Sequence, residues 1–120
     1  MPSKVLIVDD EPNIVEILGR LLAQQGYEIR TAASAEEALA LLDHEPVNAI
    51  LLDNNLPGMT GMRALAEIRR RTAAPTLLMT GHFDEGFATD ALLLGAAGIL
   101  SKPFDFTKVE ALLARLIAKA

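Results

Sequence analysis

Residues 47–61 read VNAILLDNNLPGMTG, and this stretch decides the fold. Its first six residues are too apolar and too few for anything but a β-strand buried on both faces. Asp53 follows directly, and a turn-rich loop comes after it. Parallel sheets covered by helices contain such strands, and they bind ligands beyond the carboxyl ends of the strands. Asp53 therefore occupies a position where a ligand site is expected.

Short apolar runs alternate with amphipathic runs along the whole chain. The expected strands cover residues 4–9, 27–31, 47–52, 76–80 and 98–101. The expected helices cover residues 12–25, 35–44, 60–71, 84–94 and 106–118. Five β–α repeats with nearly continuous apolar strands predict an α/β domain with helices on both faces of a parallel sheet. Right-handed crossovers favour a flavodoxin-like (βα)5 doubly wound sheet with strand order 2-1-3-4-5, in one domain over residues 1–120.

Local signals mark several helix ends. Pro12 suits the first position of a helix, and Gly26 suits the position after its last turn. Ser34, with Glu37 three residues later, forms a capping-box pattern, and Asp105 can cap the last helix. Apolar residues recur three and four positions apart in the first and last helices, namely Ile14, Ile17, Leu18, Leu21 and Leu22, and Val109, Leu112, Leu113, Leu116 and Ile117.

The composition excludes several classes of function. The chain has 120 residues, no cysteine and a formal net charge of -5 at pH 7. Without cysteine there is no disulfide framework, thiolate metal site or cysteine nucleophile. The negative charge disfavours direct binding to nucleic acid or to an anionic membrane surface. The N-terminus lacks the long apolar region of a signal peptide, and no stretch is long enough to span a bilayer, so we expect a cytoplasmic protein without a membrane segment.

Charged and hydroxyl side chains follow four of the expected strands. In the order 2-1-3-4-5 the first and third strands are neighbours, so Asp9 and Asp10 should converge on Asp53. Thr80 and Lys102 end the fourth and fifth strands. Three carboxylates, a hydroxyl and an ammonium group at one edge of the sheet suit a divalent metal and a phosphoryl group.

The motifs at these strand ends resemble those of the receiver domains of bacterial two-component response regulators, the CheY-like superfamily. The resemblance covers the whole chain. Each motif is weak alone, but all of them in this order are specific. They are Asp9-Asp10, Asp53 with Leu56-Pro57-Gly58-Met59 and Gly61, Thr80-Gly81, and Lys102-Pro103-Phe104.

The resemblance implies that Asp53 accepts a phosphoryl group from a histidine kinase or phosphotransfer protein, with Mg²⁺ as cofactor. Asp10, Asp53 and the backbone carbonyl of Asn55 would bind the metal directly, and Asp9 would act through water. Such a domain catalyses its own phosphorylation and dephosphorylation and is not a turnover enzyme in the usual sense. Three carboxylates this close repel one another, which favours a divalent cation.

The resemblance also implies roles around the phosphoryl group. Lys102 would pair with the acceptor at rest and with the phosphoryl oxygens afterwards, while Thr80 would donate a hydrogen bond to them. The Lys102–Pro103 peptide would be cis. Asn55 and His82 would tune hydrolysis, although for His82 a loop position without a role is an equal alternative.

Ile99 departs from the family pattern, which has Tyr or Phe three residues before the lysine. Isoleucine is stiff at χ1 and cannot swing as a ring does. We therefore expect a weaker or differently routed response at the face formed by the helix at 84–94, the strand at 98–101 and the helix at 106–118. A downstream output domain or effector protein would read that face.

Two further positions are unusual. Leu93, in a run of three leucines, should point away from the sheet and extend an apolar patch near Ile99. That patch would serve a homodimer or another partner, whereas a stray exposed leucine would need no function, and the sequence leaves both open. Asn54 is polar where the family usually has an apolar residue, and the sequence offers no reason for it.

Two other functions compete with a phosphorylation switch. A pseudo-receiver would act as a phosphate-independent interaction module, supported by Ile99 and opposed by the complete acidic set. A phosphatase of the haloacid dehalogenase type would use similar residues, but its nucleophile follows the first motif strand and its acidic pair comes last, the reverse of the order here. The sequence also leaves open whether the domain acts alone or is the receiver part of a longer protein.

Overall fold

The computed structural model describes residues 2–81, 84–103 and 105–119. Its strands are β1 (Lys4–Val8), β2 (Glu28–Ala32), β3 (Ala49–Asp53), β4 (Thr76–Thr80) and β5 (Gly98–Ser101). Its helices are α1 (Pro12–Gln24), α2 (Ala35–Leu42), α3 (Gly61–Arg71), α4 (Glu85–Leu93) and α5 (Phe106–Lys119). All five strands pair in parallel in the order β2-β1-β3-β4-β5, which confirms the predicted fold.

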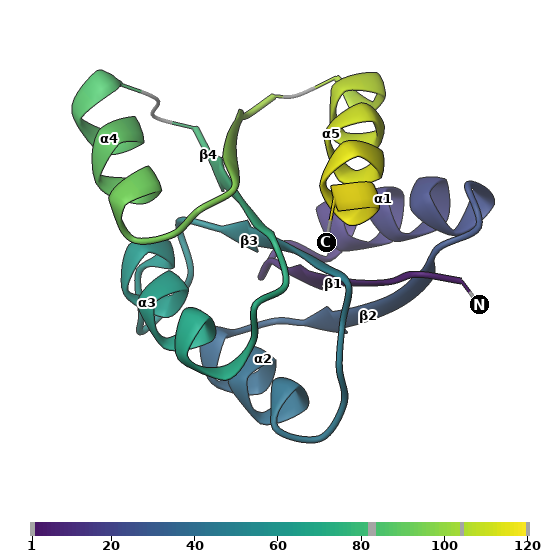
Figure 1. The fold of residues 1–120 in the computed structure, drawn as a ribbon, viewed down its shortest axis with the longest axis horizontal. Coiled ribbons are helices and arrows are strands. Elements are labelled where there is room, and N and C mark those ends of the chain that lie inside the picture. The colour runs from purple at the N-terminus through teal and green to yellow at the C-terminus, as the bar shows by residue number, and fades with distance from the viewer. Residues whose placement is uncertain (1, 82–83, 104, 120) are drawn as a thin grey trace.

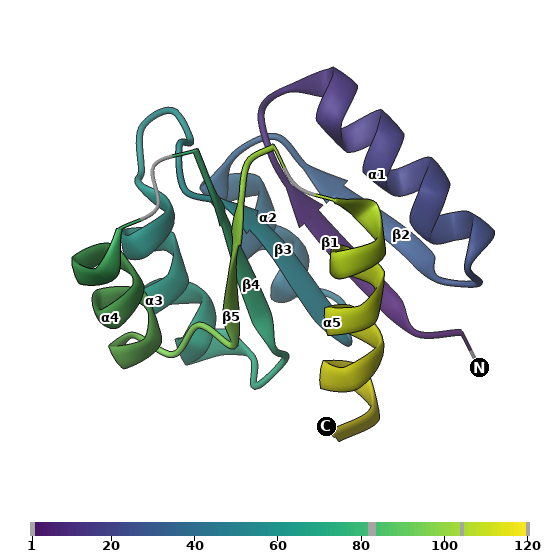
Figure 2. The same cartoon turned by 90° about the horizontal axis from the view of Figure 1, so that it is seen from above.

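The sheet lies between two layers of helices (Figure 1). Helices α1 and α5 cover one face, and α2, α3 and α4 cover the other, as the view from above also shows (Figure 2). Successive side chains of a strand point to opposite faces, so each face has its own apolar cluster. In β1, for example, Leu6 and Val8 pack toward α2, α3 and α4, whereas Val5 and Ile7 pack toward α1 and α5. The central strands are buried on both faces, which explains why β1, β3 and β4 read as nearly continuous apolar runs, whereas the edge strand β2 includes Glu28 and Arg30.

The register of the sheet places the polar strand ends side by side. Val8 of β1 is opposite Leu52 of β3, so the next residues, Asp9 and Asp53, emerge at the same level. On the other side of β3, Asp53 is opposite Met79 of β4. Thr80 is one residue further along β4, opposite Ser101 of β5, and Lys102 follows Ser101 directly. The carboxyl edge of the central strands therefore carries the residues that the sequence singled out.

Three of the predicted helix ends are confirmed. Pro12 is the first residue of α1, and Gly26, just beyond the end of α1, has a φ of 96°, which is favourable for glycine alone. Asp105 precedes α5, and its Oδ1 accepts a hydrogen bond from the peptide N–H of Thr107 at 2.8 Å.

One of the two hydrogen bonds expected for the capping box before α2 is confirmed, and the other has a different donor. The Ser34 hydroxyl accepts a hydrogen bond from the Glu37 peptide N–H at 3.1 Å, as expected. The Glu37 carboxylate, however, accepts from the N–H of Ala33 at 3.4 Å, one residue earlier than the pattern predicts. The extended backbone at Ser34 presents the preceding N–H to this carboxylate instead.

The apolar face predicted for α1 is wrong at one position. Leu18 and Leu22 are buried against the sheet, but Ile17 is 57% exposed. The sheet reaches only the central row of the helix, so Ile17 lies at the margin, in the wall of a small pocket that also includes Phe106 of α5. Among the described helices, none is both long and apolar enough to cross a membrane.

Candidate functional site

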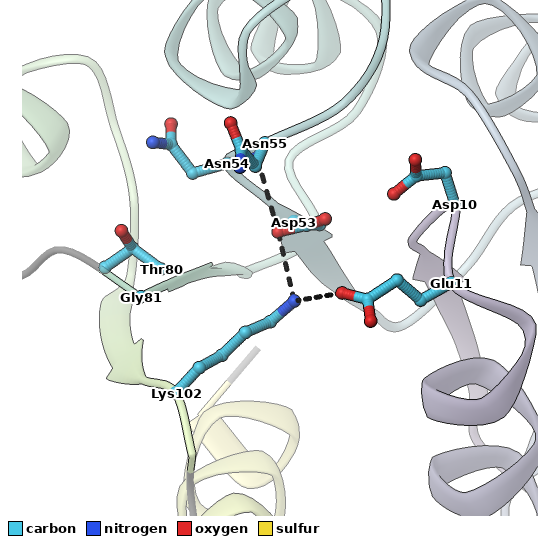
Figure 3. Close-up of a pocket in the computed structure, with 8 residues that line it drawn as sticks. All are labelled: Asp10, Glu11, Asp53, Asn54, Asn55, Thr80, Gly81 and Lys102. Atoms are coloured by element: carbon cyan, nitrogen blue, oxygen red, sulfur yellow. Dashed lines mark hydrogen bonds and ion pairs between the residues drawn. The ribbon is translucent and has the colours of Figure 1, made fainter.

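A pocket of about 310 Å³ opens at the carboxyl ends of the central strands. Strand β3 supplies its floor, the loop after β1 supplies one wall, and the ends of β4 and β5 supply the other (Figure 3). Its lining residues are Asp10, Glu11, Asp53, Asn54, Asn55, Thr80, Gly81 and Lys102. The strand ends predicted from the sequence thus converge, while His82 lies outside the described residues.

Three carboxylates form a cluster in this pocket. One carboxylate oxygen from each of Asp9, Asp10 and Asp53 lies within 4.8 Å of the others. Asp9 and Asp53 are 1% and 2% exposed, whereas Asp10 is exposed and directs its carboxylate toward Asp53 (Figure 3). Hard divalent cations prefer such oxygen ligands, and Mg²⁺ commonly keeps several waters beside one or two carboxylates. The cluster combines two buried carboxylates with one that is exposed to water, and it therefore fits that preference.

Lys102 provides the positive charge at the centre of the site. Its Nζ lies 3.2 Å from Asp9 Oδ2 and 3.2 Å from Asp53 Oδ1, and 3.8 Å from Glu11 Oε1. The ammonium group therefore links the end of β5 to the ends of β1 and β3. The peptide N–H of Lys102 donates to the carbonyl of Thr80 at 2.7 Å, and the Lys102–Pro103 peptide is cis, as expected.

The charges of the site perturb one another. Burial raises the pKa of the Asp9 carboxyl, and the nearby charge of Asp53 raises it further, against the hydrogen bond from the Glu11 N–H and the charge of Lys102. Burial alone would lower the pKa of Lys102, but the carboxylates of Asp9 and Asp53 outweigh it, so its pKa is raised. The two carboxylates therefore stabilise the charged form of Lys102, and burial disfavours the charged form of Asp9.

Hydrogen-bond donors and acceptors complete the walls of the pocket. Thr80, 3% exposed, ends β4 on the side away from Asp10 (Figure 3). The peptide N–H of Asn55 donates to Asp53 Oδ1 at 3.3 Å, which fixes the direction of that carboxylate. Asn55 itself is exposed at the mouth of the pocket.

Two residues of the site were missed by sequence reasoning. Glu11 contributes a third carboxylate near Lys102, and the only sequence signal for it is its place directly after Asp9-Asp10. Asn54 lines the pocket, and its side-chain Oδ1 is buried without a hydrogen-bond partner among the described residues. The polarity of Asn54 was noticed, but its buried atom is a product of the packing.

The surface on the α4 side is more apolar than predicted. Ile99 is half-buried and packs on the cluster beneath α2, α3 and α4. Leu92, Leu93 and Leu94 are 56%, 80% and 42% exposed, so the whole run is accessible, where the sequence led us to expect mainly Leu93. In α4, Ala91 is buried and Phe87 is half-buried against the apolar cluster, whereas Leu92 and Leu93 at its end face solvent.

A carboxylate beside an ammonium group and further carboxylates is an arrangement that can support phosphoryl chemistry. A carboxylate is a weak nucleophile, and it becomes an acceptor where positive charge neutralises the incoming phosphoryl oxygens. Asp53 has an ammonium group at 3.2 Å and a potential cation position formed with Asp9 and Asp10. The pocket is open enough for a phosphoryl group and a bound cation.

Known proteins share this sequence pattern. Residues 5–114 match the family model of the response regulator receiver domain. The chain is 34% identical over 116 residues to the regulatory protein AtoC of Escherichia coli (strain K12), covering 96% of this chain and 25% of that protein. It is 35% identical over 117 residues to the probable transcriptional regulator ycf27 of Cyanophora paradoxa, covering 98% and 49%. The chain thus spans between a quarter and a half of the length of these curated relatives.

Solved structures share the fold. The chemotaxis protein CheY4 of Vibrio cholerae superimposes with a TM-score of 0.91 at 32% identity, covering 97% of this chain and 99% of that chain. The receiver domain of the sensor histidine kinase PA1611 of Pseudomonas aeruginosa PAO1 superimposes with a TM-score of 0.88 at 26% identity, covering 98% and 99%. The PA1611 structure has a magnesium ion coordinated in its active site cleft.

Proposed function

The chain belongs to the family of response regulator receiver domains of two-component systems, and from this premise we propose that it is a phosphorylation switch whose acceptor is Asp53. The strongest support is the surroundings of that carboxylate. It is buried, it lies 3.2 Å from the Lys102 ammonium, and it shares a possible cation position with two further carboxylates. A site built only for packing would not gather three like charges around one lysine.

The donor set fits Mg²⁺. Asp10 and Asp53 would bind it through carboxylate oxygens, Asn55 through its backbone carbonyl, and Asp9 through a water. All of these ligands are oxygens, which Mg²⁺ requires, and the exposed side of the cluster leaves room for retained waters. When bound, the ion would neutralise negative charge on the acceptor and on the phosphoryl oxygens.

The transfer step is an in-line displacement at phosphorus. A carboxylate oxygen of Asp53 forms the new O–P bond, and the bond from phosphorus to the imidazole nitrogen of a phosphohistidine breaks, with its electron pair returning to the ring. Lys102 would turn from the carboxylate to the phosphoryl oxygens, and Thr80 would donate its hydroxyl hydrogen to one of them. The donor is a histidine kinase or a phosphotransfer protein.

The reverse chemistry resets the switch. A water attacks the phosphorus, the O–P bond to Asp53 breaks, and inorganic phosphate leaves while the carboxylate is restored. Asn55 lies at the mouth of the pocket, where its side chain can orient or obstruct that water. We propose the same tuning role for His82. The domain thus assists its own phosphorylation and dephosphorylation without acting on an external substrate.

The signal would leave through the face formed by α4, β5 and α5. A phosphoryl group binds the two conformations of the domain unequally and shifts a pre-existing equilibrium between them. An output domain or effector protein in the cytoplasm would read the shift, and the exposed leucines at the end of α4 make a homodimer through this face a second expectation. Ile99 would make the response weaker or differently routed than an aromatic residue would.

Intact-protein mass after incubation with acetyl phosphate and Mg²⁺ tests the proposal. The wild type should gain one phosphoryl group, and chelation of the metal should abolish the gain. Asp53→Ala should gain none, whereas Asp43→Ala, which removes an exposed aspartate far from the pocket, should behave as the wild type. A folded protein that binds Mg²⁺ but gains no mass would instead support a phosphate-independent interaction module.

A further inference from the structure

Asn54 has one polar atom that its surroundings leave unsatisfied. Its peptide N–H donates to the carbonyl of Met79 at 2.8 Å, and its own carbonyl accepts from the N–H of Gly61 at 2.9 Å. The side-chain Oδ1, in contrast, is buried and has no hydrogen-bond partner among the described residues. A buried acceptor without a donor raises the free energy of the state that contains it.

Gly61 explains why this atom is held where it is. A Cβ at Gly61 would overlap the Cα of Asn54 and would lie 3.0 Å from Asn54 Oδ1. The first turn of α3 therefore packs directly on the backbone and the amide of Asn54. The backbone is fixed by two hydrogen bonds and this contact, so the side-chain torsions are the only freedom that Asn54 keeps.

The amide lies beside the place that a phosphoryl group on Asp53 would occupy. Asn54 lines the same pocket as Asp53, and its side chain lies on the Thr80 side, across from Asp10 and Glu11 (Figure 3). The acidic side of the pocket suits a cation. The Thr80 side is where neutral hydrogen-bond donors can reach phosphoryl oxygens, and an asparagine amide carries two donor hydrogens.

We propose that Asn54 is a phosphoryl-binding residue, which rests on the proposed function of Asp53. When Asp53 carries a phosphoryl group, the Asn54 side chain turns about χ1 and χ2, and Nδ2 donates a hydrogen bond to a phosphoryl oxygen. The turn breaks no hydrogen bond made by Oδ1 to a described residue, and it moves that oxygen from burial toward water. Hydrogen bonds to a charged group are the strong ones, so both ends of the amide favour the phosphorylated state.

Substitutions at Asn54 separate this role from simple packing. Asn54→Leu keeps a side chain of similar size against Gly61 but has no donor, whereas Asn54→Gln keeps the amide. Gln24→Leu is the matched control, because it replaces an exposed amide by leucine at the far end of α1. The probe is the beryllium trifluoride anion with Mg²⁺, which mimics a phosphoryl group on a carboxylate, and its apparent affinity is measured by NMR titration.

Asn54→Leu should weaken beryllium trifluoride binding by about tenfold, as the loss of one charged hydrogen bond implies. Asn54→Gln should recover most of the affinity, and Gln24→Leu should not change it. Without the anion, Asn54→Leu should melt at the same temperature as the wild type or higher, because the unpaired acceptor is gone. A purely structural role would leave the affinity for the anion unchanged, whatever the melting temperature.

Wild-type affinity in Asn54→Leu would overturn the role of Asn54 and leave Asp53 as the acceptor. If the wild type fails to bind the anion at all, the assignments of both Asn54 and Asp53 are wrong. Asn54→Met replaces Asn54→Leu if the leucine variant does not fold, since its flexible side chain adapts to the contact with Gly61.

Discussion

Helices α3 and α4 lie next to each other on the same face of the sheet, but they are held in very different ways (Figure 2). Helix α3 buries four residues, Gly61, Ala64, Leu65 and Ile68. In α4, all of whose residues the structure describes, Ala91 is the one buried residue. Helix α4 then ends in leucines that face solvent, with Leu93 80% exposed.

The difference indicates which side of the pocket can respond to a phosphoryl group. Helix α3 begins against Asn54 and holds the acceptor side of the pocket in place. Helix α4 follows Thr80 in the chain and has one buried residue, Ala91, beside the half-buried Phe87, so its displacement is opposed by less lost hydrophobic stabilisation than that of α3. We therefore expect α3 to stay fixed and α4 to move when Asp53 is phosphorylated.

The largest expected contrast comes from one leucine in each helix. Leu65 of α3 is fully buried, so Leu65→Ala should lower the free energy of unfolding by about 2–5 kcal/mol. Leu93→Ala in α4 should change it by less than about 0.5 kcal/mol, because the side chain is already in water. Urea denaturation of both variants measures the contrast. A loss at Leu93 comparable to that at Leu65 would show that α4 is anchored as firmly as α3.

Substitution of one glycine in each helix tests the same difference in stability between α3 and α4. Gly61→Ala places a Cβ 2.9 Å from the Asp53 carbonyl oxygen and on top of the Asn54 backbone, which should destabilise the protein by about 1–3 kcal/mol. Among the described residues, a Cβ from Gly86→Ala in α4 meets Asp84 Oδ1 alone, at 3.4 Å, and the substitution should stabilise the helix by up to about 1 kcal/mol. Opposite signs in urea denaturation are expected, and a neutral Gly61→Ala would contradict the tight contact at the start of α3.

Asp9→Asn tests the electrostatics of the pocket, and we expect it to change the stability less than the substitutions in α3 above. Because the pKa of Asp9 is raised in the folded protein, the fold binds its proton more tightly than the unfolded chain does, and stability falls as pH rises above the ordinary value of 3.8. The neutral asparagine removes that penalty while Lys102 keeps Asp53 as a partner. Without metal, the variant should therefore melt a few degrees above the wild type at pH 7, with a smaller difference near pH 4.

Mg²⁺ provides the control for Asp9→Asn. The ion should raise the melting temperature of the wild type more than that of the variant, because the variant has lost a charged group near the cation. A variant that melts below the wild type at pH 7 without metal would show that the ion pair with Lys102 outweighs the burial of Asp9.

Ile99→Tyr should have the smallest effect on stability, and its effect should be confined to the part of the molecule around α4 and β5. Ile99 is half-buried beside the apolar cluster under α4, so a ring at this position has room to lie toward solvent. We expect the substitution to enlarge the phosphorylation-dependent chemical-shift changes of α4 and β5 and to alter partner affinity. Unchanged shifts and affinity would mean that Ile99 does not limit the response.

The sequence predicted the positions of the strands and helices because the sequence signals for them are local or periodic. No predicted strand or helix differs from the structure by more than two residues at either end. Strands β1, β3 and β4 have apolar interiors, and Pro12, Gly26 and Asp105 mark helix ends through rules that act within a few residues. The convergence of Asp9 and Asp10 on Asp53 followed from strand order, whereas the pairing of Lys102 with Asp53 was implied by the resemblance to receiver domains.

Features that depend on packing between distant segments were not predictable. Ile17 fits the apolar period of α1, yet it is 57% exposed and lies in a surface pocket beside Phe106. The exposure of the leucines after Ala91 depends on how α4 packs against the rest of the molecule. The buried Oδ1 of Asn54 results from the approach of Gly61, seven residues later in the chain, and only coordinates can show it.

Amide hydrogen exchange with and without acetyl phosphate, in the presence of Mg²⁺, tests most directly the claim that phosphorylation of Asp53 moves α4 against a fixed α3. Asp53→Ala under the same conditions is the control. In the wild type, exchange should change in peptides from α4 and β5 while peptides from α3 keep their protection, and the control should show neither change. Equal changes in α3 and α4, or changes that persist in Asp53→Ala, would contradict the account.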